Sequence, residues 1–165
     1  MTDEQARIRS YLQAQGARQA PADIVDKVLA AMADLRRAAG AIPTARFEQR
    51  PEPEEWSGNE VLAHVVDAGR HFGDQIIEML ADTPRPRRGL SMSERRPMGE
   101  WFSILERDRQ TLFDAVRAAD PNAKLVASIQ HQWFGMLNWR EALLFMRLHD
   151  LDHVGQLQKI AAALA

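Results

Sequence analysis

The sequence predicts an all-α fold, a four-helix bundle with a short additional helix at the N-terminus. Apolar residues recur at helical spacing in four long windows and almost nowhere alternate strictly, which is the pattern of amphipathic helices. The 165 residues, 45% of them hydrophobic, are enough to bury one core without disulfides or a structural metal. We expect a single domain over residues 1–165, because no repeat, linker or low-complexity tract divides the chain.

The first two expected helices lie before residue 41. A short helix around residues 3–15 precedes the first bundle helix, residues 22–39, whose apolar residues fall on one face. Pro21 suits the first turn of this helix, where a missing backbone N–H costs nothing. Gly40 follows the last apolar position and is expected to adopt a left-handed conformation that stops the helix.

The second bundle helix, residues 58–80, has an explicit start signal. Ser57 can cap its first turn while Glu60 reaches back to the cap, and Trp56 can pack against the first turn as a hydrophobic staple. The third bundle helix, residues 97–119, carries apolar residues on one side and ends before Asp-Pro. Both windows therefore predict helices that bury one face.

The last helix, residues 138–164, begins with another capping pair, Asn138 and Glu141. Three connections are long for a simple up-and-down bundle, namely residues 41–56, 81–96 and 120–137. The spacing of the helices therefore leaves their order around the core open.

Three histidines on two of these helices indicate a site for one divalent metal ion. His149 and His153 are four residues apart, which places them on one helix face about 6 Å apart along the axis. His64 lies among apolar residues on the second bundle helix and also faces the core. Three neutral imidazoles suit a divalent ion with an open position for water or substrate. His71, about 10.5 Å beyond His64 along the axis, is too distant to share that ion.

Composition and charge exclude several other classes of protein. The formal charge of −2 and the pI near 6.2 disfavour binding to nucleic acid, including a role as a nucleic-acid-binding stress factor. The absence of cysteine excludes disulfides, cysteine-ligated metal sites and a cysteine nucleophile. The polar start and the lack of a long apolar stretch predict a cytoplasmic protein that does not bind membranes.

Further residues near the histidines or in the basic loop are candidates for functional roles. Candidates for acid–base catalysis, each with a side chain that can accept a proton, are Asp67, His131 and Asp150. Candidates for contacts with a substrate or cofactor are Arg87, Arg88 and Gln156. Each of the six also has a plainer interpretation, as polarity at the edge of the bundle for Gln156 and as a solvated or loop residue for the others.

Two parts of the chain resemble signatures of the DinB/YfiT-like superfamily of helical-bundle proteins. EWSGNEVLAHVVDA (residues 55–68) is similar to its first signature, and HQWFG, NWREAL and HDLDHVGQLQKI (between residues 131 and 160) to its closing signature. The resemblance implies an up-down-down-up bundle, often dimeric, with a divalent metal held by three histidines. The matching positions are occupied by His64, His149 and His153. The closing loop departs from the family pattern, since it has His131-Gln132 where His-Pro is common.

The resemblance also implies a class of function. Some relatives are transferases or isomerases that use bacillithiol, mycothiol or glutathione, and others are described as hydrolases only by inference. We therefore expect one Zn²⁺ or Ni²⁺ ion, a small-molecule substrate, a low-molecular-weight thiol as the nucleophile if the protein is a transferase, and a homodimer. The alternative is a non-enzymatic metal-binding or dimerisation module whose histidines are structural, because a shared fold does not establish a shared activity.

Overall fold

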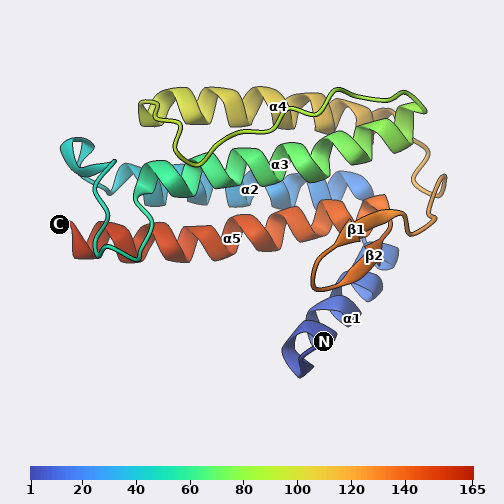
Figure 1. Ribbon diagram of the computed structural model, residues 1–165. Coiled ribbons are helices and arrows are strands. Elements are labelled where there is room, and N and C mark those ends of the chain that lie inside the picture. Colours follow the sequence, from blue (N-terminus) through green and yellow to red (C-terminus); the bar gives the residue numbers. More distant parts are fainter.

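The computed structural model describes residues 1–165 as an all-α protein with one small β-hairpin (Figure 1). The helices are α1 (Asp3–Arg18), α2 (Pro21–Gly40), α3 (Gly58–Ala81), α4 (Met98–Ala118) and α5 (Trp139–Ala163). A short 3-10 turn, η1 (Thr44–Arg46), follows α2. Strands β1 (Ile129–His131) and β2 (Gly135–Leu137) pair in antiparallel fashion just before α5. The predicted fold class is confirmed.

The bundle has the up-down-down-up order that the family resemblance implied. Helices α2 and α5 run in one direction along the bundle, and α3 and α4 run in the other (Figure 1). Helix α5 packs against α2 and α3, and α4 packs against the same two helices from the other side. Because α3 and α4 are parallel, the connection between them runs back along the length of the bundle (Figure 1). Helix α1 leaves the bundle at an angle and packs on α5.

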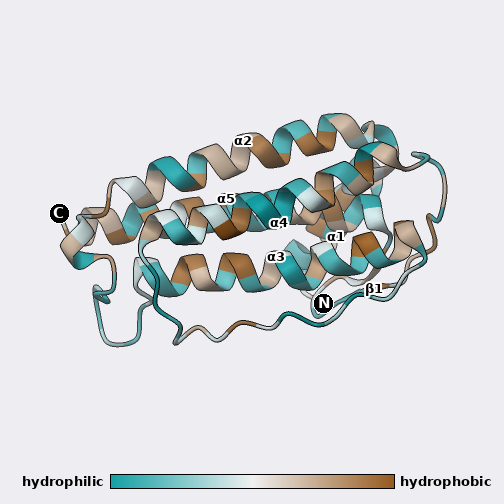
Figure 2. Ribbon diagram, turned by 90° about the horizontal axis from the view of Figure 1, so that it is seen from above, coloured by the Kyte–Doolittle hydropathy of each residue, from teal (hydrophilic) through white to brown (hydrophobic).

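One hydrophobic core of 36 buried residues fills the interior of the bundle. Hydrophobic positions recur along each bundle helix between hydrophilic ones, as Figure 2 shows from above. The largest fully buried side chains include Trp101, Trp139 and Phe113, which belong to α4 and α5. No helix is both long enough and apolar enough to cross a lipid bilayer.

The helix starts agree with the local sequence signals. The Ser57 side chain accepts a hydrogen bond from the backbone of Glu60, whose carboxylate accepts one in return. Asn138 and Glu141 form the same reciprocal pair at the start of α5. Each pair satisfies backbone donors that a helix leaves unpaired at its N-terminus. These caps fix where α3 and α5 begin, and hence the height of their histidines in the bundle.

The expected left-handed stop at Gly40 is wrong. Gly40 is the last residue of α2, and the next residue, Ala41, keeps right-handed helical angles (φ −78°, ψ −15°). The backbone N–H groups of Ala41 and Ile42 bond to the carbonyls of Ala38 and Ala39, so the last turn tightens and needs no left-handed residue. The glycine with a positive φ is Gly135 instead, at 72°.

The β-hairpin lies in a connection for which the sequence predicted no regular structure. Its buried residues alternate with exposed ones in β1, where Ile129 and His131 face inward and Gln130 faces solvent. Gly135 starts the return strand with a backbone angle that glycine adopts without strain. Three residues per strand are too few for an alternation pattern to stand out in the sequence. The hairpin contacts α3 and α5, and it brings the 131–134 turn close to the histidines.

Candidate metal centre

Three imidazole nitrogens converge between α3 and α5. The Nε2 atom of His149 lies 3.0 Å from Nε2 of His64 and 3.2 Å from Nε2 of His153. One ligand atom from each of the three residues lies within 4.8 Å of the others. His149 and His153 share a face of α5 because they are four residues apart, and the packing of α3 on α5 adds His64. The structure thus brings the three predicted metal ligands together.

The spacing of these nitrogens fits one divalent ion. Two nitrogens at about 2.0–2.1 Å from a tetrahedral Zn²⁺ ion are about 3.3 Å apart. The observed separations of 3.0 and 3.2 Å are close to this value. Without a cation these nitrogens pair through hydrogen bonds whose direction depends on the tautomer of each ring, whereas one shared cation could bind a lone pair of all three. The donor set, three imidazoles without a carboxylate or thiolate, suits Zn²⁺ and Ni²⁺ alike.

Gln156 orients one of the three rings. Its side-chain oxygen Oε1 lies 2.7 Å from Nδ1 of His153. Because an amide oxygen only accepts, this hydrogen bond places the proton on Nδ1 and leaves a lone pair on Nε2, which faces the cluster. Gln156 was a candidate for contact with a substrate or cofactor, and in the structure it contacts a candidate metal ligand.

Burial keeps two of the three imidazoles neutral. Burial is the largest cause that lowers the pKa of His149 to about 2, and the neighbouring His153 and His64 lower it further. The pKa of His64 is also lowered, first by burial and then by His153, while Asp67 acts in the opposite direction. A neutral imidazole is the form that binds a metal ion. At neutral pH these two residues therefore have no proton to lose before they coordinate.

The histidine cluster opens onto a hollow of about 690 Å³ between α3, α5 and the hairpin. A second hollow of about 470 Å³ adjoins it, and Trp56 and His153 line both. The Trp56 ring lies 5.1 Å from the His64 ring and is stacked at 6.3 Å on that of His153. Trp56 was predicted as a hydrophobic staple for α3, and the sequence carried no signal that it would lie against two candidate ligands. The site is thus approachable from two sides.

Two of the three candidates for acid–base catalysis line the larger hollow, and the third does not. Asp67 lines it, and one carboxylate oxygen accepts the backbone N–H of Leu90 at 2.9 Å. His131 lines it from β1. Asp150 is fully buried, and both its oxygens accept from the guanidinium of Arg109 at 2.8 and 3.0 Å. Asp150 therefore joins α5 to α4 and does not face the hollow.

His131 is held rigidly by its own turn. Its Nδ1 atom accepts the backbone N–H groups of Trp133 and Phe134 at 3.1 and 3.3 Å. The ring stacks on Phe134 and on Phe72, with centroids 4.4 and 5.6 Å apart. Burial, followed by the charge of His71, lowers the pKa of His131 to about 4. The imidazole is therefore neutral near pH 7.

The two candidate arginines lie beside the site rather than in it. Arg88 donates to the carboxylates of Asp74 and Asp108, and these hydrogen bonds raise its pKa. Arg87 is 69% exposed, and its nearest carboxylate is that of Glu78 at 3.8 Å. Both line a small hollow next to the larger one. The Arg88 contacts tie the 82–97 connection to α3 and α4, so this guanidinium is already engaged.

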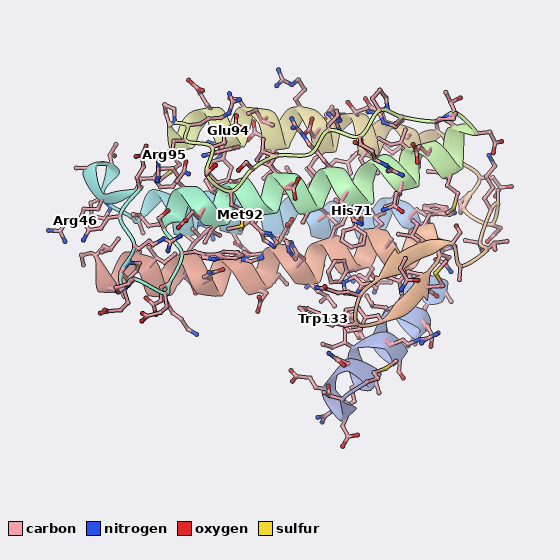
Figure 3. All side chains as sticks on the ribbon, viewed as in Figure 1. Arg46, His71, Met92, Glu94, Arg95 and Trp133 are labelled. Carbon is pink, nitrogen blue, oxygen red and sulfur yellow. The ribbon has the colours of Figure 1, made fainter.

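Figure 3 shows His71 on α3 and Trp133 on the hairpin, on the same side of the bundle. Both line the larger hollow. His71 is not part of the histidine cluster, in agreement with its distance along the helix.

Comparison with known proteins identifies the family. The DinB superfamily model matches residues 28–157, and the chain belongs to this superfamily. All three clustered histidines lie within the matched range. The structure is similar to the crystal structure of TT2238, a four-helix bundle protein, with a TM-score of 0.65 and 20% sequence identity. The match covers 84% of this chain and 98% of that chain, and at this identity it supports the fold alone. No curated protein matches the sequence.

Proposed function

We propose that the protein is a metal-dependent enzyme that acts on a small molecule. In this proposal His64, His149 and His153 hold one Zn²⁺ or Ni²⁺ ion. The observation that carries the proposal is the convergence of three Nε2 atoms at the wall of a hollow of about 690 Å³. Three protein ligands beside an accessible hollow are typical of catalytic rather than structural metal sites.

A divalent ion at this position would supply a Lewis acid that lowers the pKa of a coordinated water or thiol. The residues of the chain prepare the surroundings. Gln156 keeps the Nε2 lone pair of His153 directed at the cluster, and Trp56 covers part of two imidazole rings. The second carboxylate oxygen of Asp67 makes no hydrogen bond within the protein, so it can accept a proton from a nucleophile in the hollow.

The nucleophile in the proposed reaction comes from outside the chain. The protein has no cysteine, and no serine lines the larger hollow. Water would make the enzyme a hydrolase, and a low-molecular-weight thiol would make it a thiol S-transferase. The family resemblance implies both hydrolases and thiol transferases among the relatives. The substrate screen therefore has to include esters and amides as well as electrophiles offered together with thiols.

Metal content tests the assignment of the ligands. Protein purified without a tag or added metal is expected to contain about one Zn²⁺ or Ni²⁺ ion per chain by mass spectrometry. His149→Ala should lose this metal and keep its helical circular dichroism. His71→Ala is the matched control, because it removes a histidine of the same helix pair outside the cluster. Full metal occupancy in His149→Ala would overturn the assignment.

Activity separates the enzyme from a non-enzymatic module. Turnover of an ester, or of an electrophile with a thiol, that disappears in His149→Ala supports the enzyme. A fully loaded site that exchanges no ligand and binds no thiol or electrophile favours a metal-binding or dimerisation module. The homodimer and the cytoplasmic location are further parts of the proposal, and light scattering of the purified protein tests the first.

A further inference from the structure

We propose that the larger hollow binds a neutral molecule that has a carbonyl oxygen and an aromatic or apolar body, and that His131 donates a hydrogen bond to that oxygen. The binding of this molecule does not depend on the proposed function. Only its conversion as a substrate rests on the proposed function. His131 then has a positioning role as a fixed donor instead of a role as a general base.

The hydrogen bonds of His131 determine which of its nitrogens carries the proton. The backbone N–H groups of Trp133 and Phe134 both point at Nδ1, and a backbone N–H can only donate. Nδ1 is therefore the unprotonated acceptor, and the neutral ring carries its proton on Nε2. A turn formed by residues 131–134 thus sets the tautomer without help from any other side chain.

The Nε2–H group of His131 has no partner within the protein. Although the residue is only 4% exposed, no side-chain or backbone acceptor bonds to this nitrogen. Two side-chain nitrogens of the protein are both fully enclosed and without a hydrogen-bond partner, Arg109 Nε and Arg140 Nε. The Nε2 atom of His131 is not one of them. Because His131 lines the hollow and this nitrogen is not fully enclosed, its N–H group is available to an acceptor in the hollow. A buried donor without a partner is unfavourable unless a ligand or water supplies the acceptor.

The rest of the lining selects the charge of the ligand. The residues around the hollow include the carboxylates of Asp67 and Asp152 and no lysine or arginine. While the histidine cluster holds no metal ion, these two negative charges disfavour a carboxylate or phosphate on the ligand, so a neutral acceptor is favoured. A carbonyl oxygen is the common neutral acceptor that bonds a single N–H group well.

Aromatic side chains around His131 select the body of the ligand. Phe72 and Phe145 surround the imidazole, with ring centroids 5.6 and 4.4 Å from it. Trp133 is 54% exposed at the tip of the hairpin, and its ring lies 5.8 Å from that of His131. A large aromatic surface left open beside a hollow is a favourable contact for a flat apolar group. These walls and the donor together define the proposed ligand class.

Nitrogen NMR of the zinc-loaded wild-type protein tests the donor directly. Long-range ¹H–¹⁵N correlations at neutral pH should show His131 as the Nε2–H tautomer, assigned by loss of its signals in His131→Gln. Detection of the proton on Nδ1, or of a doubly protonated ring, would overturn the proposal. The tautomer is read from the wild-type protein, and His131→Gln serves only to assign the signals.

Three probes of similar shape test the chemistry of the ligand. Acetophenone has a carbonyl oxygen, α-methylstyrene has a CH₂ group in its place, and benzoate has a negative charge. We expect acetophenone to bind about three- to tenfold tighter than α-methylstyrene and to shift the His131 Nε2 resonance, and benzoate to bind most weakly to protein freed of metal. Equal affinities of the two neutral probes, or tightest binding of benzoate to the metal-free protein, would overturn the proposal.

Variants and metal removal separate this inference from the proposed function. His131→Gln keeps an N–H donor and should keep a preference for acetophenone, whereas His131→Phe should bind the two neutral probes equally. The titrations are repeated after removal of metal with a chelator. Carbonyl preference in a protein that binds no metal supports this inference while the proposed function fails. A loaded metal site without carbonyl preference overturns this inference alone.

Discussion

The buried ion pair between Arg109 of α4 and Asp150 of α5 distinguishes a structural from a catalytic role for Asp150. The two side chains are 2% and 0% exposed, and both carboxylate oxygens accept from the guanidinium. Asp150 follows His149 directly in α5, so the pair fixes α5 next to a candidate metal ligand. Replacing Arg109 by methionine would leave the carboxylate buried without a counter-charge.

The size of the effect follows from this burial. Removing one partner of a buried ion pair costs about 3–5 kcal/mol of unfolding free energy. In a domain of this length each kcal/mol lowers the melting temperature by about 2–4 °C, so Arg109→Met should lower it by roughly 6–20 °C. Replacing both partners, as Arg109→Met with Asp150→Leu, should recover most of the loss because no charge remains buried. The native pair is itself incompletely satisfied, since Arg109 Nε has no hydrogen-bond partner.

Scanning calorimetry and metal analysis of the single and double variants check this reasoning. We expect the double variant to melt near the wild-type temperature and to contain the same amount of metal. A double variant as unstable as Arg109→Met would refute the argument from the buried charge. Loss of activity in a stable, metal-loaded double variant would return Asp150 to the catalytic candidates.

Three further predictions concern the histidine cluster and the start of α3. Gln156→Leu removes the acceptor that orients His153 and should lower zinc affinity by about 10- to 100-fold in calorimetric titration. Because the pKa of His149 is about 2 and that of His64 is lowered, acid competes with zinc less than it would at ordinary imidazoles. Zinc affinity should therefore fall by clearly less than the about 1,000-fold expected of three ordinary imidazoles from about pH 7.5 to about pH 5.5. Ser57→Ala removes the cap of α3 and should cost about 0.5–2 kcal/mol in urea unfolding.

Each of these three predictions has a matched control. Gln156→Glu keeps an acceptor and should bind zinc more tightly than Gln156→Leu, and equal affinities would contradict the orienting role. A fall in zinc affinity of about 1,000-fold over the same pH range would show that the imidazoles are not held neutral. Ser57→Thr keeps the capping hydroxyl, so a loss as large as that of Ser57→Ala would contradict the capping argument.

The helix starts could be predicted from neighbouring residues, whereas the end of α2 and the hairpin could not. The starts of α3 and α5 follow from capping pairs three residues apart, and both were predicted correctly. Gly40 was predicted wrongly because a helix end depends on which groups satisfy the last carbonyls, and here a tightened turn does so. The hairpin escaped prediction because its strands are too short for periodicity.

The sequence by itself determined the all-α fold, the helix positions and the pairing of His149 with His153 on one face. These features depend on residues three or four positions apart, whose interactions are set by helix geometry. Only the tertiary structure decided that Trp56 lies on two of the histidines, that Asp150 pairs with Arg109, and that the His131 Nε2–H group remains free. The first two contacts join distant segments and follow from the packing of helices. The third depends on the conformation of the 131–134 turn, which helical spacing along the chain does not reveal.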